Sequence, residues 1–139
     1  MNGREGLTIV VGYDGSDAAR RALARVRDLE PRAARVLLVA VAPDLRSAGL
    51  QSQLAGGTFD AARLTDEAFD LLEAPNDSSV ELRTMTGDPA VVLVEVAREV
   101  AADLLVVGRR GGDFVVRTLL GSVAQRVVQQ APCDVLVVA

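Results

Sequence analysis

The chain alternates between short β-type segments and longer segments with helical spacing. Four apolar runs, at residues 7–11, 36–41, 104–107 and 135–138, have the length and composition of buried strands. Residues 80–85 alternate apolar and polar side chains, which is typical of a strand nearer the edge of a sheet. Between these segments, apolar positions recur every three to four residues over 19–29, 59–73, 90–101 and 123–130. This pattern predicts five strands separated by four helices.

Strands and helices in strict alternation predict a single α/β domain over residues 1–139. The expected architecture is a doubly wound, three-layer α/β/α fold around a five-stranded parallel sheet. Because crossovers between parallel strands are right-handed, we expect the strand order 3-2-1-4-5. In such a sheet the first and fourth strands are neighbours, and ligands bind beside their carboxyl ends.

Two glycine-containing segments follow the first and fourth strands. Residues 12–16 read Gly-Tyr-Asp-Gly-Ser, and residues 108–111 read Gly-Arg-Arg-Gly. The strand order predicts that these segments face each other across one crevice. Within the first segment, Asp14 is either a ligand contact or only a turn-forming residue beside the following helix. The sequence pattern alone leaves both interpretations open.

The longer glycine segment continues to the last predicted helix. Gly108, Gly111 and Gly121 are followed directly by Ser122, which we expect to be the N-cap of the helix at 123–130. Glycine lets a backbone approach a ligand closely, and amides at a helix start attract anions. The segment therefore predicts an anion-binding site. Two corresponding helix-start signals stand earlier in the chain: Ser16, and Asp88 followed by Pro89.

Composition narrows the function classes. The net charge of −4 argues against general attraction to nucleic acid or to anionic lipid, so a phosphate ligand has to be held by local geometry. We expect a cytoplasmic protein, since no apolar run approaches the roughly 20 residues of a membrane span and the only cysteine is Cys133. The chain has no histidine, and all 15 of its basic residues are arginine. Without histidine the chain cannot form His-based catalytic triads or His-based metal sites. Without lysine it can have neither Schiff-base chemistry nor a standard P-loop.

The chain resembles the universal stress protein family, and specifically its ATP-binding branch. The branch's signature, Gly-x2-Gly-x9-Gly-Ser/Thr, is matched by Gly108, Gly111, Gly121 and Ser122 without any change of spacing. Flanking stretches agree at 10–16 (VVGYDGS), 86–111 (TGDPAVVLVEVAREVAADLLVVGRRG) and 131–138 (APCDVLVV). The resemblance implies the adenine nucleotide alpha hydrolase-like fold and a nucleotide-bound switch or sensor in stress adaptation.

The family's binding residues carry over by position. Asp14 would lie beside the ribose and phosphates or their Mg²⁺, and the backbone of Val41 would contact the adenine edge. Gly108 and Gly111 would line the ribose and phosphates, while residues 121–123 (Gly-Ser-Val) would hold the β- and γ-phosphates through N–H groups and the serine hydroxyl. Relatives often have a histidine just before the Val41 position, where this chain has alanine. Nothing functional aligns in residues 43–60.

The resemblance also implies a homodimer formed through the C-terminal strand at 134–138. We expect ATP binding with at most slow hydrolysis and no catalytic residue, because no candidate base is evident near the phosphates. Two alternatives stay open: a nucleotide-free dimeric stress scaffold, and a binder of AMP or cyclic AMP. An adenylate-forming or dinucleotide enzyme is disfavoured, because neither glycine segment reads Gly-x-Gly-x-x-Gly and the chain has no lysine.

Overall fold

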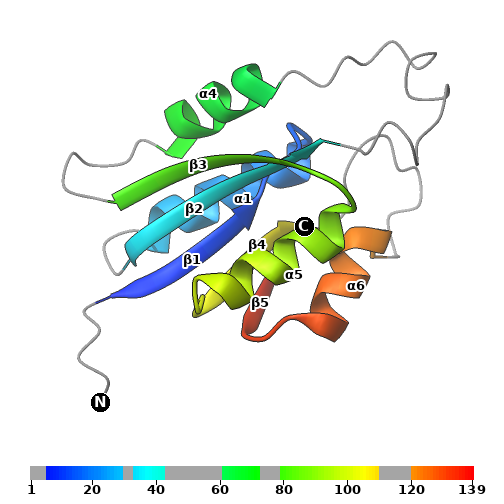
Figure 1. Ribbon diagram of the computed structural model, residues 1–139. Helices are drawn as coiled ribbons and strands as arrows, with labels where there is room; N and C mark the ends of the chain where they lie inside the picture. Colours follow the sequence, from blue (N-terminus) through cyan, green and yellow to red (C-terminus); the bar gives the residue numbers. More distant parts are fainter. Residues whose placement is uncertain (1–5, 30–32, 43–60, 73–78, 110–119) are drawn as a thin grey trace, which may run out of the picture.

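The computed structural model describes residues 6–29, 33–42, 61–72, 79–109 and 120–139. A parallel sheet of five strands forms its centre (Figure 1). The strands are β1 (Leu7–Gly12), β2 (Ala33–Ala42), β3 (Ser79–Thr86), β4 (Leu104–Gly108) and β5 (Asp134–Val138). They lie in the order β3-β2-β1-β4-β5, which confirms the predicted order.

Helices cover both faces of the sheet. Those in the described residues are α1 (Asp17–Leu29), α4 (Ala61–Leu72), α5 (Pro89–Glu99) and α6 (Ser122–Gln130). Buried residues of α1 and α4 pack with Ile9 and Val11, whereas those of α5 and α6 pack with Val10 on the opposite face. The predicted doubly wound, three-layer architecture is confirmed. None of the described helices is long and apolar enough to cross a membrane.

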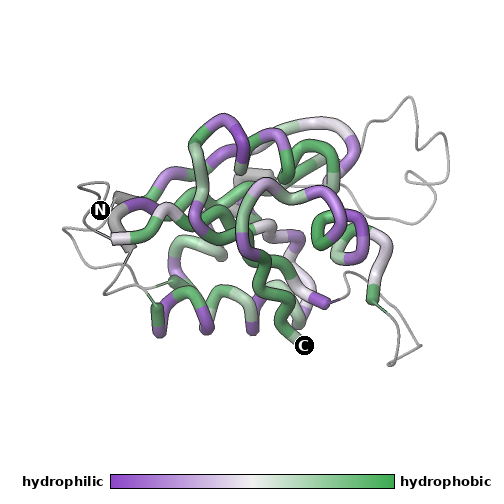
Figure 2. The backbone as a smooth tube through the Cα atoms, turned by 90° about the horizontal axis from the view of Figure 1, so that it is seen from below, coloured by the Kyte–Doolittle hydropathy of each residue, from purple (hydrophilic) through white to green (hydrophobic). Residues whose placement is uncertain are grey.

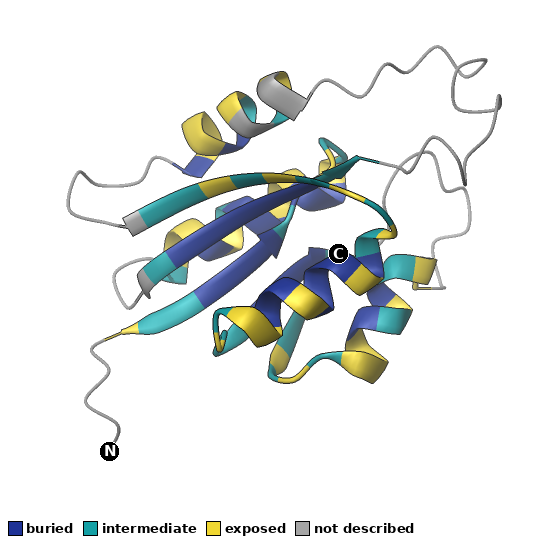
Figure 3. Ribbon diagram, in the orientation of Figure 1, coloured by how far each residue is buried: buried dark blue, intermediate teal, exposed yellow. Residues whose placement is uncertain are grey.

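Burial follows the position of each strand in the sheet. In the central strand β1, residues Ile9, Val10 and Val11 are all fully buried, because helices pack on both faces. The edge strand β3 instead exposes alternate residues, including Leu82 (Figure 3). Figure 2 shows hydrophilic residues recurring along the helices, as expected of helices that bury only one face. The prediction that residues 80–85 form a strand nearer the edge of the sheet is therefore confirmed.

Two helix ends differ from expectation. Helix α5 stops at Glu99 rather than at 101, and Ala101 adopts a φ of 52°, which right-handed helix does not allow. Helix α6 begins at Ser122, so the N-cap is Gly121 and the prediction of Ser122 as N-cap is wrong. The reason is visible in the hydrogen bonds: the amide of Gln125 donates to the carbonyl of Gly121 at 3.0 Å, which places Ser122 inside the first turn.

The pairing of β1 with β4 creates the reversal point of the sheet. Ile9 lies opposite Leu104, and the parallel register continues to Val11 and Val106. At the start of this pair, the amide of Thr8 donates to Oδ2 of Asp103 at 2.9 Å, and the amide of Asp103 donates to the carbonyl of Thr8 at 2.8 Å. The carboxyl ends of β1 and β4 consequently lie side by side, which is where a doubly wound sheet binds its ligands.

Candidate functional site

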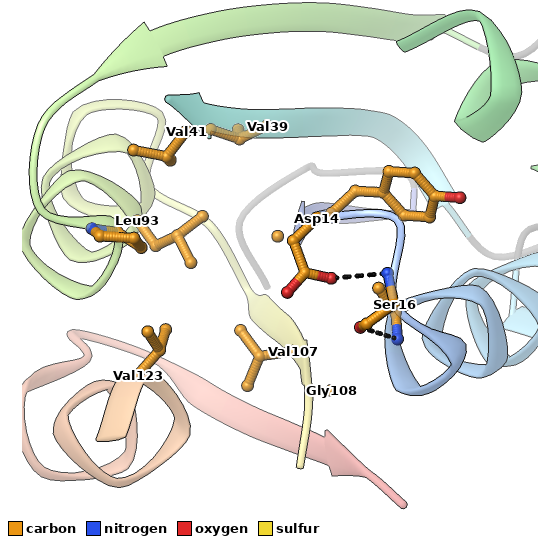
Figure 4. Close-up of a pocket in the computed structure, with 12 residues that line it drawn as sticks. Asp14, Ser16, Val39, Val41, Leu93, Val107, Gly108 and Val123 are labelled. Carbon is orange, nitrogen blue, oxygen red and sulfur yellow. Dashed lines mark hydrogen bonds between the residues drawn. The ribbon is translucent and has the colours of Figure 1, made fainter. Parts of the chain in front are cut away.

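A pocket opens at the carboxyl ends of β1 and β4 (Figure 4). It is open to solvent and holds about 560 Å³ of space not filled by protein atoms, solvent at its mouth included. Twelve residues line it: Gly12, Tyr13, Asp14, Ser16, Ala19, Val39, Val41, Pro89, Leu93, Val107, Gly108 and Val123. Segments that are far apart in the sequence thus meet at one place, as the strand order predicted.

The pocket has an apolar side and a polar side. Val41 of β2, Leu93 of α5 and Val123 of α6 present aliphatic side chains on one side, while Asp14 and Ser16 lie on the other, in the turn between β1 and α1 (Figure 4). An apolar slot beside a polar turn suits a ligand that combines a flat, weakly polar ring with hydrophilic groups.

The structure assigns a turn-forming role to Asp14. Its Oδ1 accepts a hydrogen bond from the amide of Ser16 at 2.9 Å, and Oγ of Ser16 in turn accepts one from the amide of Ala19 at 3.1 Å. Ser16 is therefore the cap of α1, as predicted. Asp14 nevertheless stays exposed, and its carboxylate extends into the pocket (Figure 4). Turn formation and ligand contact are thus compatible for this residue.

Helix α5, which also borders the pocket, is capped by its own sequence. Oδ1 of Asp88 accepts hydrogen bonds from the amides of Ala90 at 3.0 Å and Val91 at 3.4 Å, with Pro89 in the first turn, as predicted. The same carboxylate accepts two bonds from Nη1 of Arg126, at 2.8 and 3.0 Å, which tie α5 to α6. The hydrogen bond from Arg126, aided by those from the backbone, lowers the pKa of Asp88.

Helix α6 differs from its neighbours at its first turn. Its N-cap is Gly121, and no side-chain cap hydrogen bond forms there within the described residues. The first-turn amides of α1 and α5 are partly satisfied by Ser16 and Asp88, whereas no side-chain acceptor of this kind caps α6 among the residues that the structure describes. Val123 in this turn lines the pocket. The N-terminus of α6 is therefore the end best suited to hold an anion.

The predicted site residues are only partly brought together. Asp14, Val41, Gly108 and Val123 line the pocket. Gly121 and Ser122 immediately precede Val123 at the start of α6, without lining the pocket themselves. Gly111 lies outside the described residues.

Gly108 has a packing role that the sequence did not reveal. A Cβ atom at this position would lie 2.8 Å from Cβ of Ala18 and 3.0 Å from its carbonyl carbon. At the end of β1, a Cβ on Gly12 would lie 2.8 Å from Cδ1 of Leu93. The end of β4 therefore needs glycine so that α1 can pack close to it, whereas at Gly12 a methyl group would meet only the end of the Leu93 side chain. Close packing is thus a second reason for glycine at position 108, beside the predicted close approach of a ligand.

Sequence reasoning missed several lining residues. Val39 stands two positions before Val41, so the period of two in a strand was a usable signal for it. Leu93 lies one helical turn after Pro89, but its depth in the pocket depends on how α5 packs on the sheet. Tyr13 was passed over between Gly12 and Asp14, although it is 3% exposed and lines the pocket.

The backbone of Arg109 joins the end of β5 to the start of α6. Its amide donates to the carbonyl of Val138 at 2.6 Å, and its carbonyl accepts from the amide of Gly121 at 2.8 Å. Its Nε is buried and has no hydrogen-bond partner within the described part of the chain. Arg109 itself is not among the residues that line the pocket. The described residues contain no group of three or more His, Cys, Asp or Glu side chains able to hold a metal ion.

Tyr13 is linked to helix α4 through a charged cluster. Its hydroxyl donates to Oε1 of Glu67 at 2.6 Å, and Nε of Arg20 donates to the same oxygen at 2.9 Å. Burial, together with the hydrogen bond to Glu67 and its negative charge, raises the pKa of Tyr13 to about 12. The hydrogen bonds from Tyr13 and Arg20 lower the pKa of Glu67. The turn beside the pocket is therefore fixed to α4.

Tyr13 is the only tyrosine in a chain without tryptophan, so its titration can be followed directly. We expect tyrosinate absorbance of the folded protein to rise with a midpoint near pH 12, against about 10 for the denatured chain. Because the folded pKa is the higher one, this group's contribution to stability is complete below pH 10 and is lost as pH rises toward 12. Rapid pH-jump absorbance measures the folded midpoint; equal midpoints in both states would contradict the cluster.

Known proteins resemble this chain in sequence and in fold. A sequence model of the universal stress protein family matches residues 7–139. A universal stress protein of Mycobacterium tuberculosis is 36% identical over 138 residues, covering 94% of each chain. Another, from Thermus aquaticus, is 36% identical over 136 residues, covering 94% of this chain and 97% of the relative.

Solved structures share the fold. The crystal structure of a universal stress protein in complex with cAMP is similar with a TM-score of 0.76 and 32% identity, over 98% of this chain and 99% of that one. A universal stress protein from Archaeoglobus fulgidus in complex with dAMP gives a TM-score of 0.71 at 23% identity, over 98% and 100% of the two chains.

Proposed function

The chain belongs to the universal stress protein family, and on this basis we propose that it binds an adenine nucleotide, ATP, in the pocket at the ends of β1 and β4. The observation that carries this proposal is the pairing of an apolar slot with a helix start that has no side-chain cap among the described residues. A relative of known structure at 32% identity was crystallised with cAMP, which supports the same ligand class. The protein would act as a nucleotide-bound switch or sensor in stress adaptation.

Each part of the nucleotide has suitable partners. Adenine would lie against the aliphatic side chains of Val41 and Leu93, with the backbone of Val41 at its edge. The ribose would lie beside Gly108 and Asp14. A micromolar ligand requires about 8 kcal/mol of binding free energy. Burial of the base and several amide contacts must supply most of it, since a helix terminus contributes about 0.3–2 kcal/mol.

The phosphates would extend toward the start of α6. The amides of Ser122 and Val123 and the hydroxyl of Ser122 would hold the β- and γ-phosphates, with Gly111 as a further backbone contact from the predicted motif. The amide of Gly121 donates to the carbonyl of Arg109 at 2.8 Å, so it would have to exchange this partner for a phosphate oxygen to take part. Mg²⁺ would bind to the phosphates and to Asp14, which would supply one carboxylate ligand.

We propose that the pocket holds its nucleotide with at most slow hydrolysis. Asp14 is the only acidic residue in the described lining, and one of its oxygens is occupied by the amide of Ser16. Rapid phosphoryl transfer would need a group that positions the attacking water as well as the metal. Incubation with labelled ATP and Mg²⁺ tests this; turnover faster than about 1 s⁻¹, the range of ordinary enzymes, would contradict it.

The nucleotide itself can be identified from the purified protein. Denaturation followed by chromatography of the supernatant should release ATP, and calorimetry on the stripped protein should give tighter binding for ATP than for AMP or cyclic AMP. Preference for AMP or cyclic AMP would keep the site but change the ligand. An empty supernatant together with no calorimetric signal would instead favour the nucleotide-free scaffold.

We also propose a homodimer formed through β5. This strand lies at the edge of the sheet, and its apolar residues Val135, Leu136 and Val137 are only half-buried. An edge strand presents unpaired backbone groups, so a second copy can extend the sheet. Light scattering at micromolar concentration should give twice the mass of the chain; the mass of one chain would contradict the proposal.

A further inference from the structure

The cluster around Glu67 connects helix α4 to the nucleotide pocket. We propose that Glu67 is a positioning residue for this pocket, and that nucleotide binding and the docking of α4 on the β1–α1 turn stabilise each other. The inference rests on the proposed nucleotide binding, because it concerns how the same site is regulated. It assigns α4 the role of the element whose position depends on whether the pocket is filled.

The first link is the side chain of Tyr13. The residue lines the pocket, while its hydroxyl donates to Oε1 of Glu67 at 2.6 Å. Only 3% of Tyr13 is exposed, so the ring cannot move without losing contacts on both sides. Asp14, the next residue, extends its carboxylate into the pocket (Figure 4). A change at Glu67 therefore reaches the ligand through a single buried side chain.

The second link is a direct packing contact with the turn. Gly15 has a φ of +80°, and a Cβ atom there would lie 2.7 Å from Cδ2 of Leu64. Helix α4 thus packs against the backbone of the same turn that carries Asp14. Leu64 and Glu67 are three positions apart and lie on neighbouring parts of one helix face. Together they hold the turn at two points.

The third link is electrostatic. Oε1 of Glu67 also accepts the bond from Nε of Arg20 at 2.9 Å, and Nη1 of Arg20 donates to Asp17 in the first turn of α1 at 3.2 Å. The positive charge of Arg63 on α4 also acts on the Glu67 carboxylate. One carboxylate thus joins α4, α1 and the phenol of Tyr13. Hydrogen bonds that involve a charged group are the stronger kind, so this junction favours one arrangement of the turn.

Coupling between the two sites follows from linkage. If the turn adopts its binding arrangement more often when α4 is docked, undocking lowers the fraction of molecules that can bind nucleotide. The apparent nucleotide affinity then falls in proportion to that fraction. The reverse holds with the same factor, so bound nucleotide must favour docked α4. A purely structural role for the cluster would instead change the melting temperature and leave affinity and the effect of nucleotide on α4 unchanged.

The test combines three variants with two measurements. Glu67→Ala removes both bonds, Glu67→Gln keeps an uncharged acceptor, and Asp70→Asn changes an exposed carboxylate on the same helix as the control. Calorimetry gives ATP affinity, and amide hydrogen exchange over residues 61–72 with and without ATP gives the docking of α4. Tyr13→Phe, which removes only the hydroxyl, provides a second route if Glu67→Ala does not fold.

In the wild type and the control, ATP should slow exchange over 61–72. Glu67→Ala should bind ATP about fivefold more weakly, at the low end of ordinary coupling, and lose the slowing, with Glu67→Gln in between. A wild type that binds ATP without any change in α4 exchange, or a folded Glu67→Ala with wild-type affinity, would overturn this inference and leave the proposed function standing. A wild type that binds no nucleotide would overturn both.

Discussion

Replacing Ser122 by aspartate should weaken ATP binding by about 100-fold or more while leaving the fold intact. Ser122 is exposed in the first turn of α6, where a carboxylate interacts favourably with the helix dipole. The same charge would face the phosphates proposed to lie at these amides. Two unit charges 4 Å apart repel by about 4 kcal/mol near a protein surface, and a triphosphate carries several charges. Calorimetry at fixed salt measures the change, since screening affects it.

Two comparisons separate charge from shape in this experiment. Ser122→Asn introduces a side chain of nearly the same size without the charge, and we expect an affinity within about fivefold of the wild type, the cost of one hydrogen bond. Adenosine has no phosphate, so its binding should be equal in Ser122→Asp and wild type. If the aspartate variant loses adenosine as strongly as ATP, the phosphates do not lie at the start of α6.

Replacing Gly108 by alanine should lower the free energy of unfolding by about 2–3 kcal/mol, the upper range for overpacking. The added methyl group would lie 3.0 Å from the carbonyl carbon of Ala18 and 3.1 Å from the amide nitrogen of Ala19. These are backbone atoms of the first turn of α1, so they cannot rotate away as a side chain can. The helix must shift from β4 as a whole. Urea denaturation followed by circular dichroism measures the loss.

A matched pair of variants tests this reason. Gly12→Ala also adds a methyl group at a strand end, but it meets the end of the Leu93 side chain, which can adjust, so a loss of only about 1 kcal/mol is expected. Ala18→Gly in the Gly108→Ala background removes the contact of 2.8 Å with Cβ and leaves the backbone contacts. Only partial recovery is therefore expected. Full recovery, or equal losses for Gly108→Ala and Gly12→Ala, would show that the backbone of α1 is not the obstacle.

The arrangement of the sheet was predictable because it follows from the order of strands and helices along the chain. Alternating β and α segments with right-handed crossovers allow few topologies. The sequence therefore predicts that β1 and β4 are neighbours in the sheet, as they are. That neighbouring placed Asp14 and Gly108 at one pocket. Whether these residues contact a nucleotide stays a prediction.

Details at the level of one residue were less predictable. Gly121 and Ser122 are both acceptable N-caps, so the sequence cannot decide between them, and the hydrogen bond from Gln125 does. The link from Tyr13 to Glu67 depends on how α4 docks on the rest of the fold. From sequence, Glu67 looks like an ordinary solvated carboxylate on an amphipathic helix. Contacts of this kind appear only once the elements are assembled.

The pairing of β1 with both β2 and β4 has a consequence for synthesis of the protein. Strand β2 leaves the ribosome soon after β1, but Leu104, the partner of Ile9 on the other side, is made only after β3 and α5. Until then one edge of an apolar strand stays unpaired and open to unwanted association. A nucleotide that binds only the finished pocket would stabilise completed chains and give no help to incomplete ones.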